Sequence, residues 1–340
     1  MKTIPVENAA GTILCHDVTK IVPGEFKGPA FKRGHKVTPE DIPVLLDIGK
    51  ANLYVYDQQD GYVHEDEAAL SIARSTAGQH IEITGPEEGK ATLRASTDGL
   101  LYINPAALNS LNTFQDVTMA TLHSYRYVKK NEAVGATRVI PLAVPSGLLD
   151  NVDRLCSTAF PVVEVKPLRK AAVGIVTTGS EVYSGRIKDR FGPILKKKFN
   201  DLGSEIIEQI FVSDEVDFTA RAITTLIECK ADLIAVTGGM SVDPDDQTPN
   251  AIKQTGAEIV SYGAPTYPGA IFLLAYLNDV PIVGLPGCVM YHKASIFDLT
   301  IPRILAGEKL QRKDIVAFGY GGFCKGCDHC RFPTCDFGTI

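Results

Sequence analysis

One turn in the second half of the sequence combines glycines with acidic side chains in a pattern suited to holding a phosphate and a cation. Thr237-Gly238-Gly239-Met240-Ser241 follows an almost wholly apolar run and leads to Asp243, Asp245 and Asp246. Adjacent glycines permit positive φ and let backbone N–H groups approach an anion closely. Clustered carboxylates repel one another unless a cation or water screens them. We therefore expect Mg²⁺ here, held by Asp246, Asp243 and a ligand phosphate.

Three further turns end short runs that are rich in Val, Ile, Leu or Phe. They are Thr177-Thr178-Gly179-Ser180-Glu181, Ser213-Asp214 and Gly284-Leu285-Pro286-Gly287-Cys288. The Ser180 hydroxyl can donate a hydrogen bond to a phosphate. Asp214 either caps the next helix or holds the loop. The alternative for Asp246 is that it caps the next helix and that the acidic loop is simply solvated. Cys288 either meets the ligand or packs in the core.

The segments around these turns alternate between strands and helices. We expect strands at 172–177, 205–212, 233–237, 258–260, 271–277 and 281–284, and helices at 189–202, 217–229, 246–255 and 290–304. This alternation predicts an α/β fold with a doubly wound, mostly parallel sheet that is covered on both faces. Turns at the carboxyl ends of such strands gather around one crevice, where ligands bind. The glycine-bearing and carboxylate-bearing turns should meet there.

Residues 173 to 289 resemble the molybdopterin-binding domain that molybdopterin molybdotransferases share with molybdopterin adenylyltransferases. The matching motifs, in chain order, are Thr178-Gly179-Ser180-Glu181, Gly185 and Asp189, Asp214, Asp232 with Thr237-Gly238-Gly239, Asp246-Gln247-Thr248-Pro249, and Gly284-Leu285-Pro286-Gly287. The resemblance implies that Glu181 and Asp246 serve catalysis and cation binding. It also implies a set of residues that hold molybdopterin, namely Thr178, Gly179, Ser180, Asp214, Thr237, Gly238, Gly239, Ser241, Pro286 and Gly287.

The sequence departs from the molybdotransferase pattern at three places. Ser180 stands where the family has an aspartate in its Thr-Gly-Asp-Glu-Leu turn. After Gly287 the family continues with Asn-Pro-Val-Ser, whereas this chain continues with Cys288-Val289-Met290-Tyr291. The family's Ser-Ala-Met-Asp-Gly-Tyr-Ala motif is missing, because Asp60-Gly61-Tyr62 is too short to replace it. These differences affect the loop that the family uses for molybdate.

The resemblance implies a role in molybdenum cofactor biosynthesis. The expected reaction is the insertion of molybdate into the dithiolene of molybdopterin or its adenylated form, with Mg²⁺ positioned by Glu181 and Asp246. One alternative is a carrier or sensor without catalytic activity, which binds the finished cofactor and delivers it to a molybdoenzyme client. Another is a phosphohydrolase of the related nucleotide-cleaving family. The family also implies self-association into a homo-oligomer.

A second group of residues, four cysteines with a spacing typical of metal ligands, lies near the C-terminus. Cys324-x2-Cys327-x2-Cys330-x4-Cys335 places four thiols within twelve positions, among glycines and Pro333. This spacing can bring four thiolates around one metal centre, either a structural Zn²⁺ or an iron–sulfur cluster. His329 is a substitute ligand. A disordered tail with reactive thiols is the alternative without a metal.

The N-terminal segment is expected to act as a scaffold. Residues 1–60 resemble, over 34–56, the segment that precedes the molybdopterin-binding domain in molybdotransferases. Residues 61–165 carry short alternating runs separated by turn signals, which predict a smaller, inserted, β-rich α+β domain of unknown role. We expect the molybdopterin-binding domain at 170–310 and the cysteine-rich tail at 320–340.

Bulk properties exclude several classes of partner. At 340 residues, two or more domains are expected. The formal net charge of -6 opposes general nucleic-acid binding. No apolar run reaches membrane-spanning length, and the first residues lack the apolar core of a signal peptide. We therefore expect a cytoplasmic protein without nucleic-acid or membrane partners, whose cysteines indicate a metal site rather than a disulfide scaffold.

Overall fold

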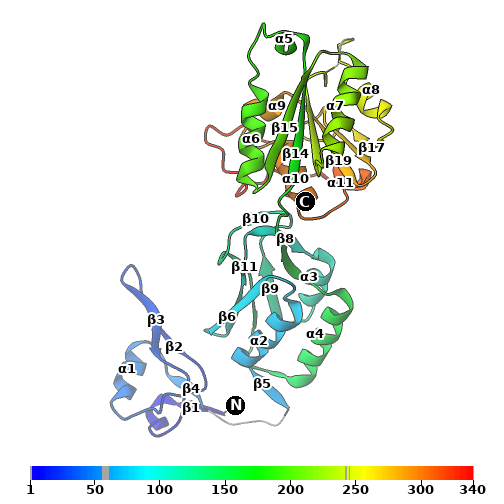
Figure 1. The fold of residues 1–340 in the computed structure, drawn as a ribbon. Coiled ribbons are helices and arrows are strands. Elements are labelled where there is room, and N and C mark those ends of the chain that lie inside the picture. The colour runs from blue at the N-terminus through cyan, green and yellow to red at the C-terminus, as the bar shows by residue number, and fades with distance from the viewer. Residues whose placement is uncertain (1, 56–60, 242, 245, 340) are drawn as a thin grey trace. The chain divides into compact units, whose positions relative to one another are not determined.

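The computed structural model describes residues 2–55, 61–241, 243–244 and 246–339. The chain divides into two compact units (Figure 1). The first unit comprises residues 1–94, 104–121 and 133–163, and the second comprises residues 95–103, 122–132 and 164–340. Among the helices of the described residues, none has the length and apolar character needed to cross a membrane.

The N-terminal part of the first unit is built from two small antiparallel pairs and one helix. They are β1 (Lys2–Pro5) with β4 (Asn52–Val55), β2 (Val18–Val22) with β3 (Phe26–Phe31), and α1 (Asp41–Asp47). A compact apolar cluster that includes Val6, Leu14, Leu45 and Leu53 holds this part together. Burial of these side chains compensates for the short strands, which would be marginal as isolated pairs.

The rest of the first unit is β-rich, as the alternating runs predict. One four-stranded antiparallel sheet has the order β6 (Ile81–Glu87), β7 (Lys90–Ala95), β11 (Ala133–Val139) and β9 (Val117–Thr121). A two-stranded pair and three helices complete it: β5 (Tyr62–His64) with β12 (Ala143–Pro145), α2 (Glu65–Thr76), α3 (Pro105–Leu111) and α4 (Ser146–Ala159). An α+β region of this kind is therefore confirmed.

The second unit contains a six-stranded sheet in which the spatial order of the strands differs from their order in the sequence. The order is β15 (Glu205–Val212), β14 (Ala172–Thr178), β16 (Leu233–Thr237), β19 (Val280–Leu285), β18 (Leu273–Leu277) and β17 (Glu258–Tyr262). The first four strands are mutually parallel, and β18 runs antiparallel to both of its neighbours. The predicted mostly parallel sheet is confirmed. A smaller sheet joins β10 (Tyr127–Val128), β8 (Gly99–Ile103) and β13 (Val163–Lys166).

Helices cover both faces of the large sheet, because alternate strand residues point to opposite sides. On one face, strand residues such as Ile175 and Ala235 pack with α6 (Phe191–Asp201) and α10 (Ile296–Leu305). On the other face, neighbours such as Val176 and Val236 pack with α7 (Val216–Glu228) and α8 (Thr248–Gln254). All five residues of β16 are buried, as a central parallel strand requires. Figure 1 shows α6 and α7 on opposite sides of the sheet.

One predicted helix is two helices in the structure. We expect a continuous helix over 290–304, but α9 (Cys288–Tyr291) ends before α10 begins. Ser295 and Asp298 form a capping box at the start of α10, in which the Ser295 side chain accepts from Phe297 N and Asp298 accepts from Ser295 N. Such reciprocal capping satisfies free N–H groups and favours a new helix start at Ser295. A last short helix, α11 (Arg312–Ala317), follows.

Candidate functional site

The turn after β14 is held in place by a carboxylate from the neighbouring strand's turn. Gly179 adopts φ +141°, and α5 (Ser180–Tyr183) starts directly after it. The Asp214 carboxylate accepts a 2.8 Å hydrogen bond from Ser180 N. Asp214 does not cap the next helix, since α7 begins at Val216 with Glu215 as its N-cap and without a side-chain cap. Asp214 therefore does not cap the helix but holds a loop, and that loop is the neighbouring turn after β14.

The turn after β16 packs directly against the turn after β14. Gly238 adopts φ +86°, and a Cβ at this position would lie only 2.3 Å from the carbonyl oxygen of Thr178. Thr248, at the start of α8, donates its hydroxyl to Gly238 O at 2.8 Å and its backbone N–H to Gly239 O at 3.1 Å. Only glycine allows both this backbone conformation and this close approach.

A buried hydroxyl without a partner lies where these two turns meet. Thr178 is 6% exposed, and its Oγ1 has no hydrogen-bond partner among the described residues. This oxygen lies 2.5 Å from the position of a Cβ on Gly238 and 3.3 Å from that of a Cβ on Gly239. Leaving a buried hydroxyl unpaired costs about 1–3 kcal/mol. A polar atom of a bound ligand would remove this cost.

The fourth turn is coupled to the glycine turn by a methionine. Met240 is buried, and its sulfur lies 2.7 Å from where a Cβ on Gly284 would be. Met240 therefore fills the space that Gly284 leaves open, and it connects the loop after β16 with the end of β19. In the turn that follows, Pro286 is buried, whereas Gly287 is exposed.

Cys288 starts α9 and is half-buried. Burial raises the pKa of its thiol above the usual range. Because the thiolate is the nucleophile and the metal ligand, this position favours a neutral thiol that contributes packing.

Near the turns after β14 and β16, one side chain that the motifs do not single out joins two predicted elements. Gln209, on β15, donates its amide to Thr177 Oγ1 at 2.9 Å and to the Asp189 carboxylate at 2.8 Å. Asp189 in turn accepts from the backbone N–H groups of Phe191 and Gly192 at the start of α6. The sequence gives little signal for this role, because Glu205 and Glu208 on the same strand are also polar. Thr237 also belongs to this layer, since it is buried and its Oγ1 donates to Thr177 Oγ1 at 3.4 Å.

The predicted acidic residues occupy two of the crevice turns. Glu181 is exposed on α5, and its carboxylate forms no hydrogen bond or ion pair with another described residue. Asp246 accepts a 3.0 Å hydrogen bond from Asp243 N, and its own N–H donates to Asp243 O at 2.9 Å. Asp246 does not cap α8, whose N-cap is Gln247. Asp245 lies outside the described residues, and Ser241 is exposed.

The described side chains do not by themselves form a complete metal site. Within residues 2–55, 61–241, 243–244 and 246–339, no three His, Cys, Asp or Glu side chains form a group that could hold a metal ion. Mg²⁺ commonly binds through one or two carboxylates together with water and substrate phosphate. Asp246 is partly exposed and Glu181 is exposed, so both carboxylates are accessible to solvent.

The cysteine-rich tail is folded back on the second unit, but its thiols are not gathered. Cys324 and Cys335 pack against the apolar core, while Cys327 and Cys330 are exposed. The segment is anchored at both ends, because Cys324 N donates to Tyr267 O and Gly338 N donates to Gly321 O. Among the described residues, these thiols do not form the predicted Zn²⁺ or iron–sulfur site.

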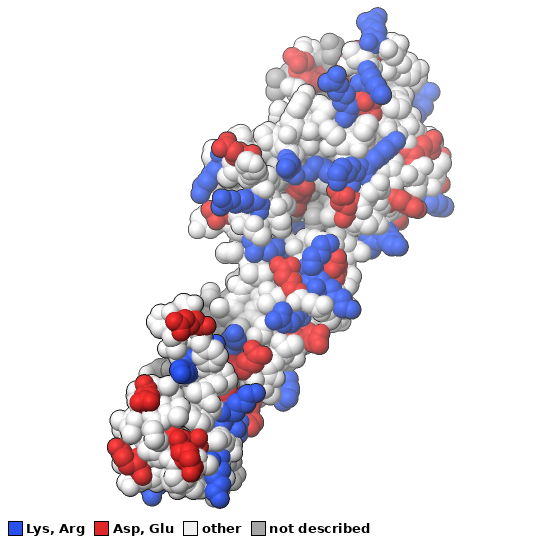
Figure 2. All heavy atoms as spheres, turned by 90° about the vertical axis from the view of Figure 1, so that its left-hand side faces the viewer, with Lys and Arg blue, Asp and Glu red and all other residues white. Residues whose placement is uncertain are grey.

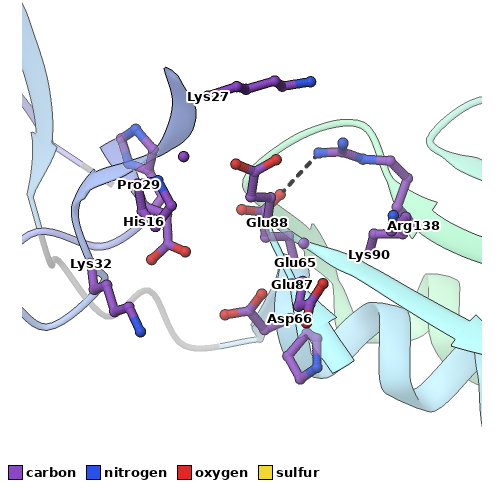
Figure 3. A pocket seen from close by; sticks show the side chains of 14 residues that line it. His16, Lys27, Pro29, Lys32, Glu65, Asp66, Glu87, Glu88, Lys90 and Arg138 are labelled. Carbon is purple, nitrogen blue, oxygen red and sulfur yellow. Dashed lines mark hydrogen bonds and ion pairs between the residues drawn. The ribbon is translucent and has the colours of Figure 1, made fainter. Parts of the chain in front are cut away.

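The first unit has a separate pocket of about 730 Å³ with charges of both signs on its walls (Figure 3). Glu65 forms an ion pair with Arg138 at 3.4 Å. Burial raises the pKa of Glu65 and lowers that of His16, which is also near Lys50. None of the predicted site residues lines this pocket.

Comparison with known proteins assigns the domain around the crevice. Residues 174–306 match the family described as "Probable molybdopterin binding domain", and residues 3–57 match a domain of unknown function. The resemblance to the molybdopterin-binding domain family is therefore confirmed for 174–306. This segment holds every predicted crevice residue.

Several relatives share this similarity. The molybdopterin molybdenumtransferase of Staphylococcus aureus is 28% identical over 131 residues, which cover 36% of this chain and 31% of that protein. The one from Haemophilus influenzae is 25% identical over 310 residues, covering 82% of this chain and 72% of that protein. The chain thus spans only about a third of the Staphylococcus aureus relative.

Two solved structures are also similar. The molybdopterin biosynthesis enzyme MoaB from Thermus thermophilus is 16% identical, with a TM-score of 0.33, covering 41% of this chain and 98% of that chain. The tungsten cofactor synthesizing protein MoaB from Pyrococcus furiosus is 20% identical, with a TM-score of 0.34, covering 40% of this chain and 95% of that chain.

Proposed function

We propose that the protein inserts molybdate into molybdopterin, or into its adenylated form, during molybdenum cofactor biosynthesis. The observation that carries the proposal is the buried, unpartnered Thr178 hydroxyl beside Gly238 and Gly239. It lies within the segment that matches the molybdopterin-binding family. A ligand polar atom at this position would satisfy the hydroxyl, and the absence of side chains on the two glycines leaves room for close approach.

The turn residues would hold the cofactor in this proposal. Thr178, Gly179 and Ser180 would contact it from the β14 side, with Asp214 keeping their turn in shape through Ser180 N. Thr237, Gly238, Gly239 and Ser241 would form the opposite wall, which Thr248 fixes from α8. Pro286 and Gly287 would shape the molybdate pocket, with Met240 setting the position of their strand end.

Glu181 and Asp246 would provide the carboxylates for Mg²⁺, with Asp243 as a further ligand. When bound, Mg²⁺ would neutralise charge on the leaving phosphate. Asp246 is already oriented by Asp243 N, whereas Glu181 has a free carboxylate on an exposed turn. This difference suits one fixed ligand and one carboxylate that can adjust to the substrate.

Incubation with adenylated molybdopterin, molybdate and MgCl₂ tests the proposal. We expect the protein to release AMP, and we expect Glu181→Ala or Asp246→Ala to abolish the release. Glu258→Ala is the matched control, because Glu258 is an exposed carboxylate on the distant edge strand β17. AMP release that persists in both site variants would contradict the assignment of these carboxylates.

A carrier that binds the finished cofactor and delivers it to a molybdoenzyme is the second candidate. The observation that favours it is the loop after Gly287, where Cys288 and Val289 replace the Asn-Pro of the molybdotransferase pattern. The neutral, half-buried Cys288 thiol is a weaker hydrogen-bond donor to the molybdate anion than an Asn amide. Stoichiometric binding of molybdopterin without AMP release would support the carrier over the enzyme.

The tail metal centre is a proposal that rests on spacing. Cys327 and Cys330 are exposed and would have to approach Cys324 and Cys335 to complete a four-thiolate site. Metal analysis and a visible spectrum of anaerobically purified protein distinguish Zn²⁺ from an iron–sulfur cluster. The double variant Cys327→Ser/Cys330→Ser should lose the metal, while Cys229→Ser, another exposed cysteine, should keep it. Metal-free protein in every preparation would refute the centre.

A further inference from the structure

An apolar groove lies on the second unit beside α6 and α10. It has a volume of about 780 Å³. Its lining is mainly apolar and includes Tyr125, Ile194, Leu202, Met290, Phe297 and Phe332. Binding pockets for drug-sized ligands have similar volumes, and their walls are likewise mostly apolar. None of the crevice residues lines this groove, so it is separate from the proposed cofactor site.

The walls of the groove belong to a basic part of an acidic chain. Between residues 186 and 201 there are six Lys or Arg and two Asp, although the whole chain has a net charge of -6. Both acidic side chains are engaged: Asp189 accepts from the first N–H groups of α6, and Asp201 pairs with Lys197 at 2.6 Å. Figure 2 shows Lys and Arg side chains spread across this face of the unit.

Cations at the groove remain available to a partner. Lys293 lines the groove and forms no ion pair within the part of the chain that the structure describes. Lys197 also lines it and is bound only to Asp201 on the helix surface, an exposed pair of small energetic value. Lys198 is different, because it is half-buried and donates to Asp298 and to Lys293 O. The accessible positive charges are therefore those of Lys197 and Lys293.

We propose that this groove binds a segment of a partner protein that carries both carboxylates and apolar side chains. The apolar walls would bury the apolar side chains, and Lys197 and Lys293 would attract the carboxylates. The α6 residues that line the groove run from Pro193 to Asp201, which corresponds to about 12 Å of helix rise. About four or five residues of extended chain cover such a length.

The shape of the site favours a polypeptide over other anionic partners. A membrane surface would require several protruding apolar side chains, whereas Tyr291 is the one large apolar residue of the described lining that is exposed, and Leu202, Ile194 and Phe297 are half-buried or buried. A nucleic acid would require phosphate contacts along a basic surface, and the lining of the groove is mainly apolar. An acidic and apolar peptide matches both properties.

The experiment uses the full chain and a fluorescein-labelled octapeptide of alternating Glu and Leu. We expect saturable binding by fluorescence polarisation, weaker at high salt because exposed charges are screened. The double variant Lys197→Glu/Lys293→Glu should weaken binding about tenfold or more, since it reverses two charges at the contact. Ile194→Asp should also weaken peptide binding, because it places a charge in the apolar wall of the groove. Lys196→Glu is the matched control, because Lys196 is exposed on α6 but does not line the groove.

Several outcomes would overturn the proposal. These are the absence of saturable binding, equal binding of an octapeptide of alternating Lys and Leu, and equal affinity of the wild type and the double variant. The proposal would also be overturned if the protein bound a single-stranded oligonucleotide or anionic vesicles instead of the peptide, and if that binding depended on Lys197 and Lys293. Circular dichroism melting of each variant shows whether a loss of binding comes from unfolding. If Ile194→Asp is unstable, the Lys197→Glu/Lys293→Glu variant still tests the proposal, because it changes only exposed side chains.

Discussion

The carboxylate of Asp214 accepts a hydrogen bond of 2.8 Å from the backbone N–H of Ser180. The two residues are 34 positions apart, on turns that follow adjacent parallel strands. This bond fixes the turn that carries Glu181 to the turn after β15. The Asp214 carboxylate therefore stabilises the shape of the turn after β14.

We expect Asp214→Ala to destabilise the protein by about 1–2 kcal/mol, because Ser180 N loses a charged acceptor. Asp214→Asn keeps an acceptor oxygen and should lose less. Urea denaturation measures the free energy of unfolding, and binding of molybdopterin should weaken in the same order. Equal stability of Asp214→Ala and the wild type would show that the turn does not depend on this bond.

Gly238→Ala should destabilise the protein strongly, because the new Cβ would lie 2.3 Å from Thr178 O in a backbone with φ +86°. Gly185→Ala is the matched control, since Gly185 has φ +73° but nothing within 4 Å of the new Cβ. The control should cost about 1 kcal/mol from backbone strain alone, and Gly238→Ala should cost more. Urea denaturation midpoints compare the two variants, and similar midpoints would refute the close-packing argument.

Gly284→Ala and Met240→Ala should show energetic coupling. A Cβ on Gly284 would lie 2.7 Å from the Met240 sulfur, so the alanine alone forces Met240 to move. In the double variant this clash is absent, and the cost should be smaller than the sum of the single costs by about 0.5–3 kcal/mol. A double-mutant cycle from urea denaturation measures this difference. Additive costs would mean that the two turns are independent.

Lys198→Met should destabilise the protein in a manner that depends on pH. Lys198 and Asp298 form an ion pair at 2.8 Å, with side chains only 14% and 17% exposed. Burial raises the pKa of Asp298, and Lys198 opposes this rise. Removing Lys198 leaves a buried carboxylate without its cation, which should cost about 3 kcal/mol at neutral pH.

The sign of the pH effect follows from the raised pKa of Asp298. A carboxyl group whose folded pKa lies above its unfolded value contributes stability below the unfolded pKa, about 3.9, and loses it as pH rises through the folded pKa. The deficit of Lys198→Met should therefore shrink as pH falls from neutral towards 4. Denaturation at pH 7.5 and 5 tests this, with Lys197→Met as the control. Loss of the exposed Lys197–Asp201 ion pair should reduce the free energy of unfolding by less than about 1 kcal/mol at either pH.

Local patterns in the sequence predicted the α/β class and the crevice turns. The apolar run Leu233–Thr237 indicated a central strand because all of its side chains are buried between two helix layers. The glycines of Thr237-Gly238-Gly239 marked the turn because their φ values require residues without a Cβ. The break before Ser295 was missed, since apolar spacing continues across 290–304 while the capping box is a short-range polar signal.

The sequence by itself determined the order of strands, helices and glycine turns in this protein, because each depends on neighbouring residues and their spacing. Only the tertiary structure decided which side chains meet. Asp214 holds Ser180, Met240 fills the space at Gly284, and Lys198 pairs with Asp298, although these partners are 34, 44 and 100 positions apart. The physical reason is that such contacts depend on how the sheet brings distant turns together, and no local periodicity encodes that.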